Sequence, residues 1–267
     1  MGVYKNRIVV KVGTSTLTNE IGQSNLRSFD KLACALSDIQ NMGYEVILVS
    51  SGAIAMGFNS LKMKTRPTSM RLKQASAAVG QCRIMFLYDK FFKDYDKTIA
   101  QILLTAEDIE DEEKKENLIN TFNTLLEMGI IPVVNENDSV SYSEIESEER
   151  LFGDNDMLSA IVAILCRAKK LVIFSDIDGL YDKDPRINPN AKLINKIESI
   201  DKFMYDVAGG AGSRRGTGGM KTKLKAAELA TSQGIDTIIT NGKNPSSLYD
   251  IVKDINVGTL FLGKSNV

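Results

Sequence analysis

The residues EVILVSSGAIA, positions 45–55, contain the clearest strand-to-helix transition in the chain. Positions 45–50 form an almost continuous apolar run, which is typical of a strand covered on both of its faces. The pair Ser51-Gly52 ends that run, and Ala53 opens a segment of helical composition. A strand that is buried on both faces and runs directly into a helix predicts a parallel sheet between two layers of helices.

The same strand-then-helix order is repeated along the whole chain. Helices are expected where apolar residues recur at helical spacing, as in 25–42, which stops at Gly43. Strands are predicted at 7–12, 45–50, 98–104, 130–135, 171–175, 235–240 and 257–262. Helices are predicted at 25–42, 69–95, 114–128, 156–167, 219–233 and 245–253. This order predicts an α/β fold, a three-layer αβα sandwich with a mostly parallel central sheet, in a single domain that spans 1–267.

The composition limits the chemistry and the partners. There is no histidine among the 267 residues, which removes the commonest general base and the commonest zinc ligand. The net charge of −1 gives no electrostatic reason to expect nucleic acid or an anionic membrane as a partner. Cys34, Cys82 and Cys166 have no metal or redox spacing, so we expect buried, reduced thiols in a cytoplasmic protein. The longest strongly apolar stretch, 158–166, is too short to span a bilayer.

Ligands of such sheets bind beyond the carboxyl ends of the strands, so polar residues at these positions are candidates for a site. The first strand ends with Lys11 and Gly13, which together suit a phosphate group, although a surface lysine beside a turn is the likelier alternative for this motif alone. The second strand ends with Ser51 and Gly52, whose unpaired N–H groups at a helix start favour an anion. An ordinary capping serine explains that pair equally well.

Two acidic and amide-rich motifs follow the strand at 130–135. Residues 135–138 (NEND) could hold a substrate ammonium group, or they could form a simple loop. Residues 153–156 (GDND) open an apolar helix, and helix capping accounts for part of their acidity. Both aspartates together with Asn155 exceed what capping requires.

Two further motifs lie in the second half of the chain. The strand ending at Ser175 continues as DIDGLYDKDPR, residues 176–186. Residues 208–223, AGGAGSRRGTGGMKTK, combine many glycines with the start of a helix, as nucleotide phosphate sites often do. A flexible linker is the alternative. Lys221 and Lys223 favour the phosphate site, because cations near a helix N-terminus are unfavourable unless an anion is bound there.

One literal motif match carries no function. Residues 258–265, GTLFLGKS, fit the pattern of a phosphate-binding loop. The central residues have strand composition, and only two residues follow, so no helix could present its N-terminus to a phosphate. We interpret this segment as the last strand.

Taken together, the strand-end motifs resemble the amino acid kinase family over nearly the whole chain, 8–262. The segment SDIDGLYDKDPR is similar across several members of that family. SSGAIAMG, NENDSV, GDND and GTGGMKTK, in this order, resemble the members that phosphorylate the side-chain carboxylate of L-glutamate in the first step of proline biosynthesis. Many bacterial relatives carry a C-terminal RNA-binding-like (PUA) domain, which we expect this chain to lack. The stretch before GDND looks longer than usual, which leaves the local substrate loop open.

The resemblance implies a role for each motif residue. Lys11 and Lys223 would flank the transferred phosphoryl group. Asp156 would orient both lysines, with Asp154 as the second candidate for that role. The acceptor amino acid would be bound by Ser51, Gly52, Ala53, Asp138 and Asn155. ATP would be bound by Lys11, Gly13, Ser175, Asp176, Tyr181, Asp184, Pro185, Thr217, Gly218, Gly219, Met220, Lys221, Thr222 and Lys223.

The resemblance also implies cofactors and partners. Mg²⁺ would bridge the phosphates of ATP and need few protein ligands, so no metal-binding residue is assigned. A homo-oligomer, either a dimer or a tetramer, and inhibition by proline are further expectations.

The proposed chemistry suits a chain without histidine. A carboxylate acceptor, with a reference pKa of about 4.3, is already ionised near neutral pH and needs no general base. Other acceptors remain open, namely N-acetylglutamate, aspartate, carbamate or UMP, although UMP would call for arginines near the acceptor loops. A non-catalytic nucleotide-binding protein of the same fold is a second alternative, but binding alone would not need Lys11, Asp156 and Lys223 together.

Overall fold

The computed structural model describes residues 4–19, 23–140, 154–185, 187–208 and 219–264. The strands are β1 (Tyr4–Val12), β2 (Glu45–Ser50), β3 (Ile99–Leu104), β4 (Ile131–Glu136), β5 (Ala168–Ser175), β6 (Lys196–Ile197), β7 (Asp236–Asn241) and β8 (Thr259–Phe261). The helices are α1 (Thr14–Leu17), α2 (Leu26–Asn41), α3 (Ala53–Ser60), α4 (Met70–Lys93), α5 (Glu107–Glu110), α6 (Glu112–Glu127), α7 (Asn155–Leu165), α8 (Lys202–Val207), α9 (Met220–Ser232) and α10 (Ser247–Ile251).

The described strands form one eight-stranded sheet in the order β3-β4-β2-β1-β5-β7-β8-β6. β1 lies inside the sheet and pairs in parallel with β2 on one side and with β5 on the other. Among the described strands, only the pair β7–β8 is antiparallel. The expected mostly parallel sheet is therefore confirmed.

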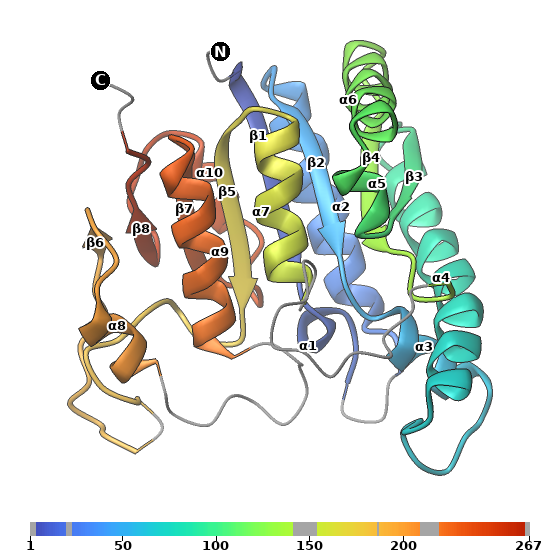
Figure 1. The fold of residues 1–267 in the computed structure, drawn as a ribbon, viewed down its shortest axis with the longest axis horizontal. Coiled ribbons are helices and arrows are strands. Elements are labelled where there is room, and N and C mark those ends of the chain that lie inside the picture. The colour runs from blue at the N-terminus through green and yellow to red at the C-terminus, as the bar shows by residue number, and fades with distance from the viewer. Residues whose placement is uncertain (1–3, 20–22, 141–153, 186, 209–218, 265–267) are drawn as a thin grey trace.

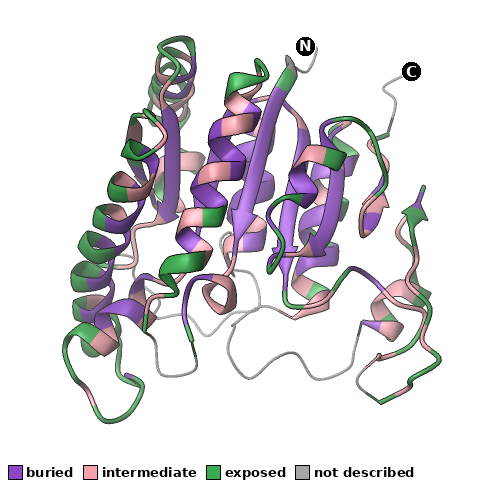
Figure 2. Cartoon of the chain, turned by 180° about the vertical axis from the view of Figure 1, so that it is seen from behind, coloured by how far each residue is buried: buried purple, intermediate pink, exposed green. Residues whose placement is uncertain are grey.

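Helices cover both faces of this sheet, as Figure 1 shows. α6, α7 and α9 pack on one face, and α2, α4 and α10 pack on the other. Along β1, Val9 belongs to the first core, whereas Ile8 and Val10 belong to the second, and none of the three is more than 1% exposed. Burial on both faces explains why the central strands are continuously apolar, and these strands are mostly buried in Figure 2. The three-layer αβα sandwich is confirmed.

The predicted helices and strands are all present, with ends that differ by three residues or fewer. β2 has the predicted bounds, and Gly43 and Gly129 end α2 and α6 with φ angles of +91° and +71°. The segment that resembles a phosphate-binding loop contains β8, so its interpretation as a strand is confirmed. The prediction missed α1, α5, α8 and β6, which are too short to show a periodic pattern. The stretch before GDND lies in residues 141–153, which are outside the described residues, so its expected length is not tested.

The three cysteines are free thiols, but they are not all buried. Cys166 is buried, Cys34 is partly exposed and Cys82 is exposed. The prediction of a buried thiol is wrong for Cys82 because α4 turns one side to solvent. None of the described helices is both long enough and apolar enough to cross a bilayer.

Two glycines let the backbones of α3 and α4 touch. A Cβ atom added to Gly80 would lie 1.7 Å from the carbonyl oxygen of Ala53, and one added to Gly57 would lie 1.7 Å from the carbonyl oxygen of Ser76. No side chain fits in either place, because backbone atoms cannot move aside as a flexible side chain can. This crossing fixes the first turn of α3, at Ala53, against the middle of α4.

We expect the Gly80→Ala variant to lower the free energy of unfolding by about 3 kcal/mol or more, because the new methyl group must push α4 away from α3. Urea denaturation measures this change. Gly43→Ala is the matched control. Gly43 has a positive φ, which Gly80 does not, and its Cβ would meet nothing within 4 Å. In the control, the free energy of unfolding should therefore fall by only about 1–2 kcal/mol, which is the cost of a Cβ atom at a positive φ. Equal losses in the two variants would contradict the tight crossing.

Candidate active site

The carboxyl ends of β1, β2, β4 and β5 lie at one edge of the sheet, the lower edge in Figure 1. The N-termini of α3, α7 and α9 lie at the same edge, and α7 and α9 run back over the sheet from there. Residues that directly follow these strands, or that open these helices, are therefore brought together from distant parts of the chain. The site is built from these strand ends and helix starts.

Three buried charged side chains form the centre of this edge. Lys11 Nζ lies 2.6 Å from Asp156 Oδ1, and Lys223 Nζ lies 2.9 Å from Asp156 Oδ2. Lys11, Asp156 and Lys223 are 6%, 1% and 7% exposed. Burial alone would raise the pKa of Asp156, but the charges of the two lysines lower it to about 2. The carboxylate thus stays ionised, and the trio keeps a net positive charge.

The start of α9 supplies two of the groups around Asp156. Thr222 Oγ1 donates a hydrogen bond of 3.0 Å to Asp156 Oδ2, beside the contact from Lys223. Lys221 is exposed. α9 begins at Gly219 without a side-chain cap and without an acidic residue in its first turn. The sequence predicted a bound anion near Lys221 and Lys223. The carboxylate of Asp156 supplies part of that negative charge.

Asp154 has a different environment from Asp156. Its Oδ1 atom caps α7 by accepting hydrogen bonds from the backbone N–H groups of Asp156 and Met157, at 2.9 and 3.2 Å. Its Oδ2 atom is buried and accepts no hydrogen bond from any described residue. The lysines contact Asp156, so the geometry favours Asp156 over Asp154 as the group that orients them.

Asn155 joins the start of α7 to the end of β2. The two hydrogens on its Nδ2 atom are shared among three acceptors, namely Ser51 Oγ at 2.8 Å, the carbonyl oxygen of Ser50 at 3.0 Å and Asn135 Oδ1 at 3.0 Å. Gly52 follows in a left-handed conformation, φ +108°, which glycine adopts readily. α3 then begins at Ala53 without a side-chain cap or an acidic residue in its first turn. The Ser51 hydroxyl and the free N–H groups of α3 can together hold an anionic group.

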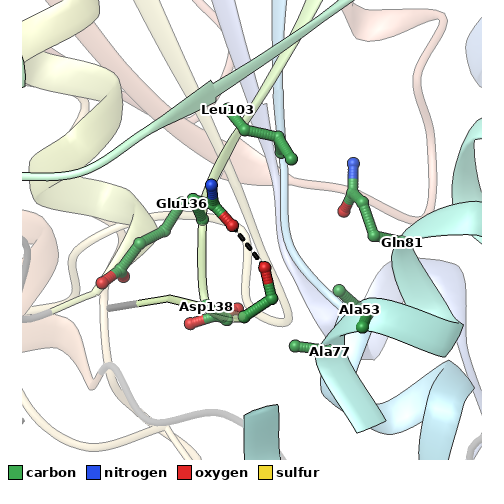
Figure 3. A pocket seen from close by; sticks show the side chains of 9 residues that line it. Ala53, Ala77, Gln81, Leu103, Glu136 and Asp138 are labelled. Atoms are coloured by element: carbon green, nitrogen blue, oxygen red, sulfur yellow. Dashed lines mark hydrogen bonds between the residues drawn. The ribbon is translucent and has the colours of Figure 1, made fainter. Parts of the chain in front are cut away.

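A small pocket lies beside this helix start (Figure 3). Gln81, Ala53 and Ala77 lie on one side of it, and Asp138 and Glu136 lie on the other. Burial raises the pKa of Asp138 to about 6. A half-buried carboxylate that is costly to keep charged gains most from a cationic ligand. The pocket can therefore accept a group with a positive charge next to a group with a negative charge.

Sequence reasoning did not assign a role to two buried residues of this region, Gln81 and Asn135. Asn135 Nδ2 donates to Gln81 Oε1 at 3.0 Å, and Asn155 Nδ2 donates to Asn135 Oδ1 at 3.0 Å. Asn135 was visible as part of the polar run after β4. The signal for Gln81 is weaker, since it is a polar residue at helical spacing between the buried positions Ala77 and Ile84 of α4.

The other half of the edge carries the residues expected to bind a nucleotide. Ser175 ends β5 and donates to Asp176 at 3.3 Å. Asp178, which the prediction left out, accepts hydrogen bonds from Tyr181 at 3.1 Å and from Asn241, at the end of β7, at 2.8 Å. The remaining described members of this group are Gly13, Asp184, Pro185, Gly219 and Met220. Thr217 and Gly218 lie outside the described residues.

No cluster of three or more acidic or cysteine side chains within the described part of the chain is arranged to hold a metal ion. Asp156 is already engaged by two lysines and by Thr222.

The model of the Amino acid kinase family matches residues 6–241. The glutamate 5-kinase of Clostridium perfringens is 55% identical over 258 residues, which cover 97% of this chain and 96% of that protein. The glutamate 5-kinase of Clostridium tetani is 52% identical over 254 residues, 95% of this chain and 93% of that protein. The one from Listeria monocytogenes serovar 1/2a is 48% identical over 97% of this chain and 93% of that protein.

Solved structures share the fold at much lower identity. UMP kinase from Ureaplasma parvum superimposes with a TM-score of 0.65 at 16% identity, over 97% of this chain and 99% of that one. Carbamate kinase from Giardia lamblia, bound to AMP-PNP, gives a TM-score of 0.68 at 15% identity, over 98% of each chain. From the family match and the high identity over nearly its whole length, the chain belongs to the amino acid kinase family.

Proposed function

We propose that the chain transfers the γ-phosphoryl group of ATP to the side-chain carboxylate of L-glutamate, which is the first step of proline biosynthesis. The observation that carries this proposal is the pair of buried ammonium groups, Lys11 and Lys223, held on the two oxygens of Asp156. The pair lies at the edge of the sheet that also carries the acceptor pocket. The relatives that are about half identical to this chain are glutamate 5-kinases.

Phosphoryl transfer requires positioning and positive charge more than covalent help from the protein. Lys11 and Lys223 would contact the oxygens of the transferred group as negative charge develops there, and Asp156 would keep both ammonium groups in place. The uncapped start of α9 would add backbone N–H groups for the phosphates. Mg²⁺, carried by ATP, would neutralise further phosphate charge.

The acceptor half suits an amino acid with a free ammonium group. The Ser51 hydroxyl and the N–H groups at the start of α3, Gly52 and Ala53 among them, would hold the reacting carboxylate. Asp138 and the Oδ1 atom of Asn155 would hold the ammonium group. An N-acetylated acceptor lacks that charge, and the acidic pocket disfavours UMP. A glutamate carboxylate is ionised at neutral pH and needs no base.

An assay with a panel of acceptors tests the proposal. ATP consumption is measured with glutamate, N-acetylglutamate, aspartate, carbamate and UMP, each at the same concentration, in the presence of Mg²⁺. We expect glutamate to give the highest kcat/KM. Faster turnover of another acceptor would show that this acceptor, and not glutamate, is the substrate. If none of the acceptors leads to ATP consumption, the alternative of a non-catalytic nucleotide-binding protein is favoured.

We expect Lys11→Ala and Lys223→Ala each to lower kcat about 10²–10³-fold, because each removes a charge that contacts the transition state. Circular dichroism and thermal melting check that the variants fold. Lys225→Ala is the matched control, since Lys225 is an exposed lysine on the same helix as Lys223. Turnover of the Lys223 variant close to that of the control would remove the proposed role.

The activity should depend on the ionisation of Asp138. Its pKa of about 6 means that the carboxylate is charged above pH 6 and protonated below it. We therefore expect kcat/KM for glutamate to be constant above neutrality and to fall about tenfold by about pH 5. Asp138→Asn should have a low kcat/KM at every pH and should lose this step. A step of the same size in the Asn variant would assign the titration to another group.

We also propose that the chain forms a homo-oligomer, works in the cytoplasm and is inhibited by proline. The outer face of α4 exposes Leu72, Val79 and Phe86 by 46%, 39% and 57%, at seven-residue intervals. A seven-residue apolar repeat suits packing against the same helix of a second copy.

Multi-angle light scattering tests this self-association. Phe86→Glu should lower the molar mass to that of a smaller assembly or a monomer, because it puts a charge into the shared apolar contact. Phe203→Glu is the control, since Phe203 on α8 is similarly exposed, at 60%. An unchanged mass for the Phe86 variant would exclude this face of α4.

A further inference from the structure

A chain of buried side-chain amides connects α4 to the acceptor site. Gln81 Oε1 accepts from Asn135 Nδ2 at 3.0 Å, and Asn135 Oδ1 accepts from Asn155 Nδ2 at 3.0 Å. Asn155 Nδ2 in turn lies 2.8 Å from Ser51 Oγ. Gln81 and Asn135 are 9% and 3% exposed, so water cannot readily replace these contacts. We call the three residues Gln81, Asn135 and Asn155 the amide relay.

Backbone groups fix the direction of the amide relay. The N–H group of Glu136 donates to Asn135 Oδ1 at 2.9 Å, and a backbone N–H can only donate. Asn135 must therefore turn its NH₂ group toward Gln81, which has to present its oxygen. At the other end, the carbonyl oxygen of Ser50 can only accept, so it must face the NH₂ group of Asn155. The hydrogen bonds at both ends of the relay therefore require the same arrangement, in which Asn155 donates to Asn135 and Asn135 donates to Gln81.

We infer that Gln81 is a positioning residue for the acceptor substrate, which rests on the function proposed above. As the acceptor for the NH₂ group of Asn135, it holds Asn135 in the place where its Oδ1 atom meets Asn155 Nδ2, and so keeps Asn155 Nδ2 beside Ser51. Asn155 Oδ1 then accepts no hydrogen bond from any described residue and is available for the ammonium group of the amino acid. Gln81 also lines the acceptor pocket beside Ala53 and opposite Asp138 (Figure 3), so it lies on the acceptor side of the site.

A matched pair of variants isolates the hydrogen bond from the packing. Gln81→Met keeps the length and helix preference of the side chain but replaces the amide oxygen that accepts from Asn135 by a sulfur that is only a weak acceptor. Gln81→Glu has nearly the same shape and keeps an accepting oxygen. We expect Gln81→Met to raise the KM for glutamate about tenfold or more, because the buried NH₂ group of Asn135 loses its partner and Asn135 no longer holds Asn155 in place. The KM for ATP should change less than about threefold, since the nucleotide half is not part of the relay.

In Gln81→Glu, the KM for the substrate glutamate should lie within about threefold of the wild-type value, because the carboxylate at position 81 still accepts the hydrogen bond from Asn135. Three results would overturn the inference: an unchanged glutamate KM in Gln81→Met, an equal rise in both KM values, or a folded Gln81→Glu protein as impaired as Gln81→Met. Thermal melting establishes whether each variant folds. The wild-type acceptor panel is measured first. If another acceptor is preferred, the proposed function fails, and the same comparison is made with that acceptor.

Discussion

The site depends on one carboxylate that binds two ammonium groups. Asp156 opens α7, and its two oxygens separately contact Lys11 at the end of β1 and Lys223 in the first turn of α9. Removing ionised groups from water costs several kcal/mol for each ion, so three of them are buried together only where good geometry offsets that cost. The ion pairs therefore require β1, α7 and α9 to meet at one point, and the parallel sheet with its layer of helices provides that point.

This arrangement explains how a chain without histidine can perform phosphoryl transfer. A hydroxyl acceptor would need a base, whereas a carboxylate acceptor needs only fixed charge and alignment. The two halves of the site have different roles, one toward the phosphates and one toward the acceptor. The lysines with the start of α9 present positive charge, and the half-buried Asp138 beside the open start of α3 favours a ligand that carries both signs of charge.

α4 links the acceptor half to the rest of the molecule. Gly80 lets it touch the first turn of α3, Gln81 contacts Asn135 at the end of β4, and its outer face exposes Val79 and Phe86. These positions are close together on one rigid helix. Any contact made by the outer face of α4 is thus within a few residues of the groups that shape the acceptor pocket.

The sequence by itself determined the fold class, the order of the long helices and strands, and the motifs at the strand ends, because burial on both faces leaves a continuous apolar run and glycine marks the helix ends. Short elements such as α8 were missed, since a few residues show no period. The family resemblance already implied that Asp156 orients Lys11 and Lys223. The tertiary structure alone decided that each lysine contacts a separate oxygen of Asp156, that Asp154 caps α7 instead, and that Gln81 supports Asn135. These pairings join residues far apart in the chain, and nothing local in the sequence records which side chains the packing of helices on a sheet will bring into contact.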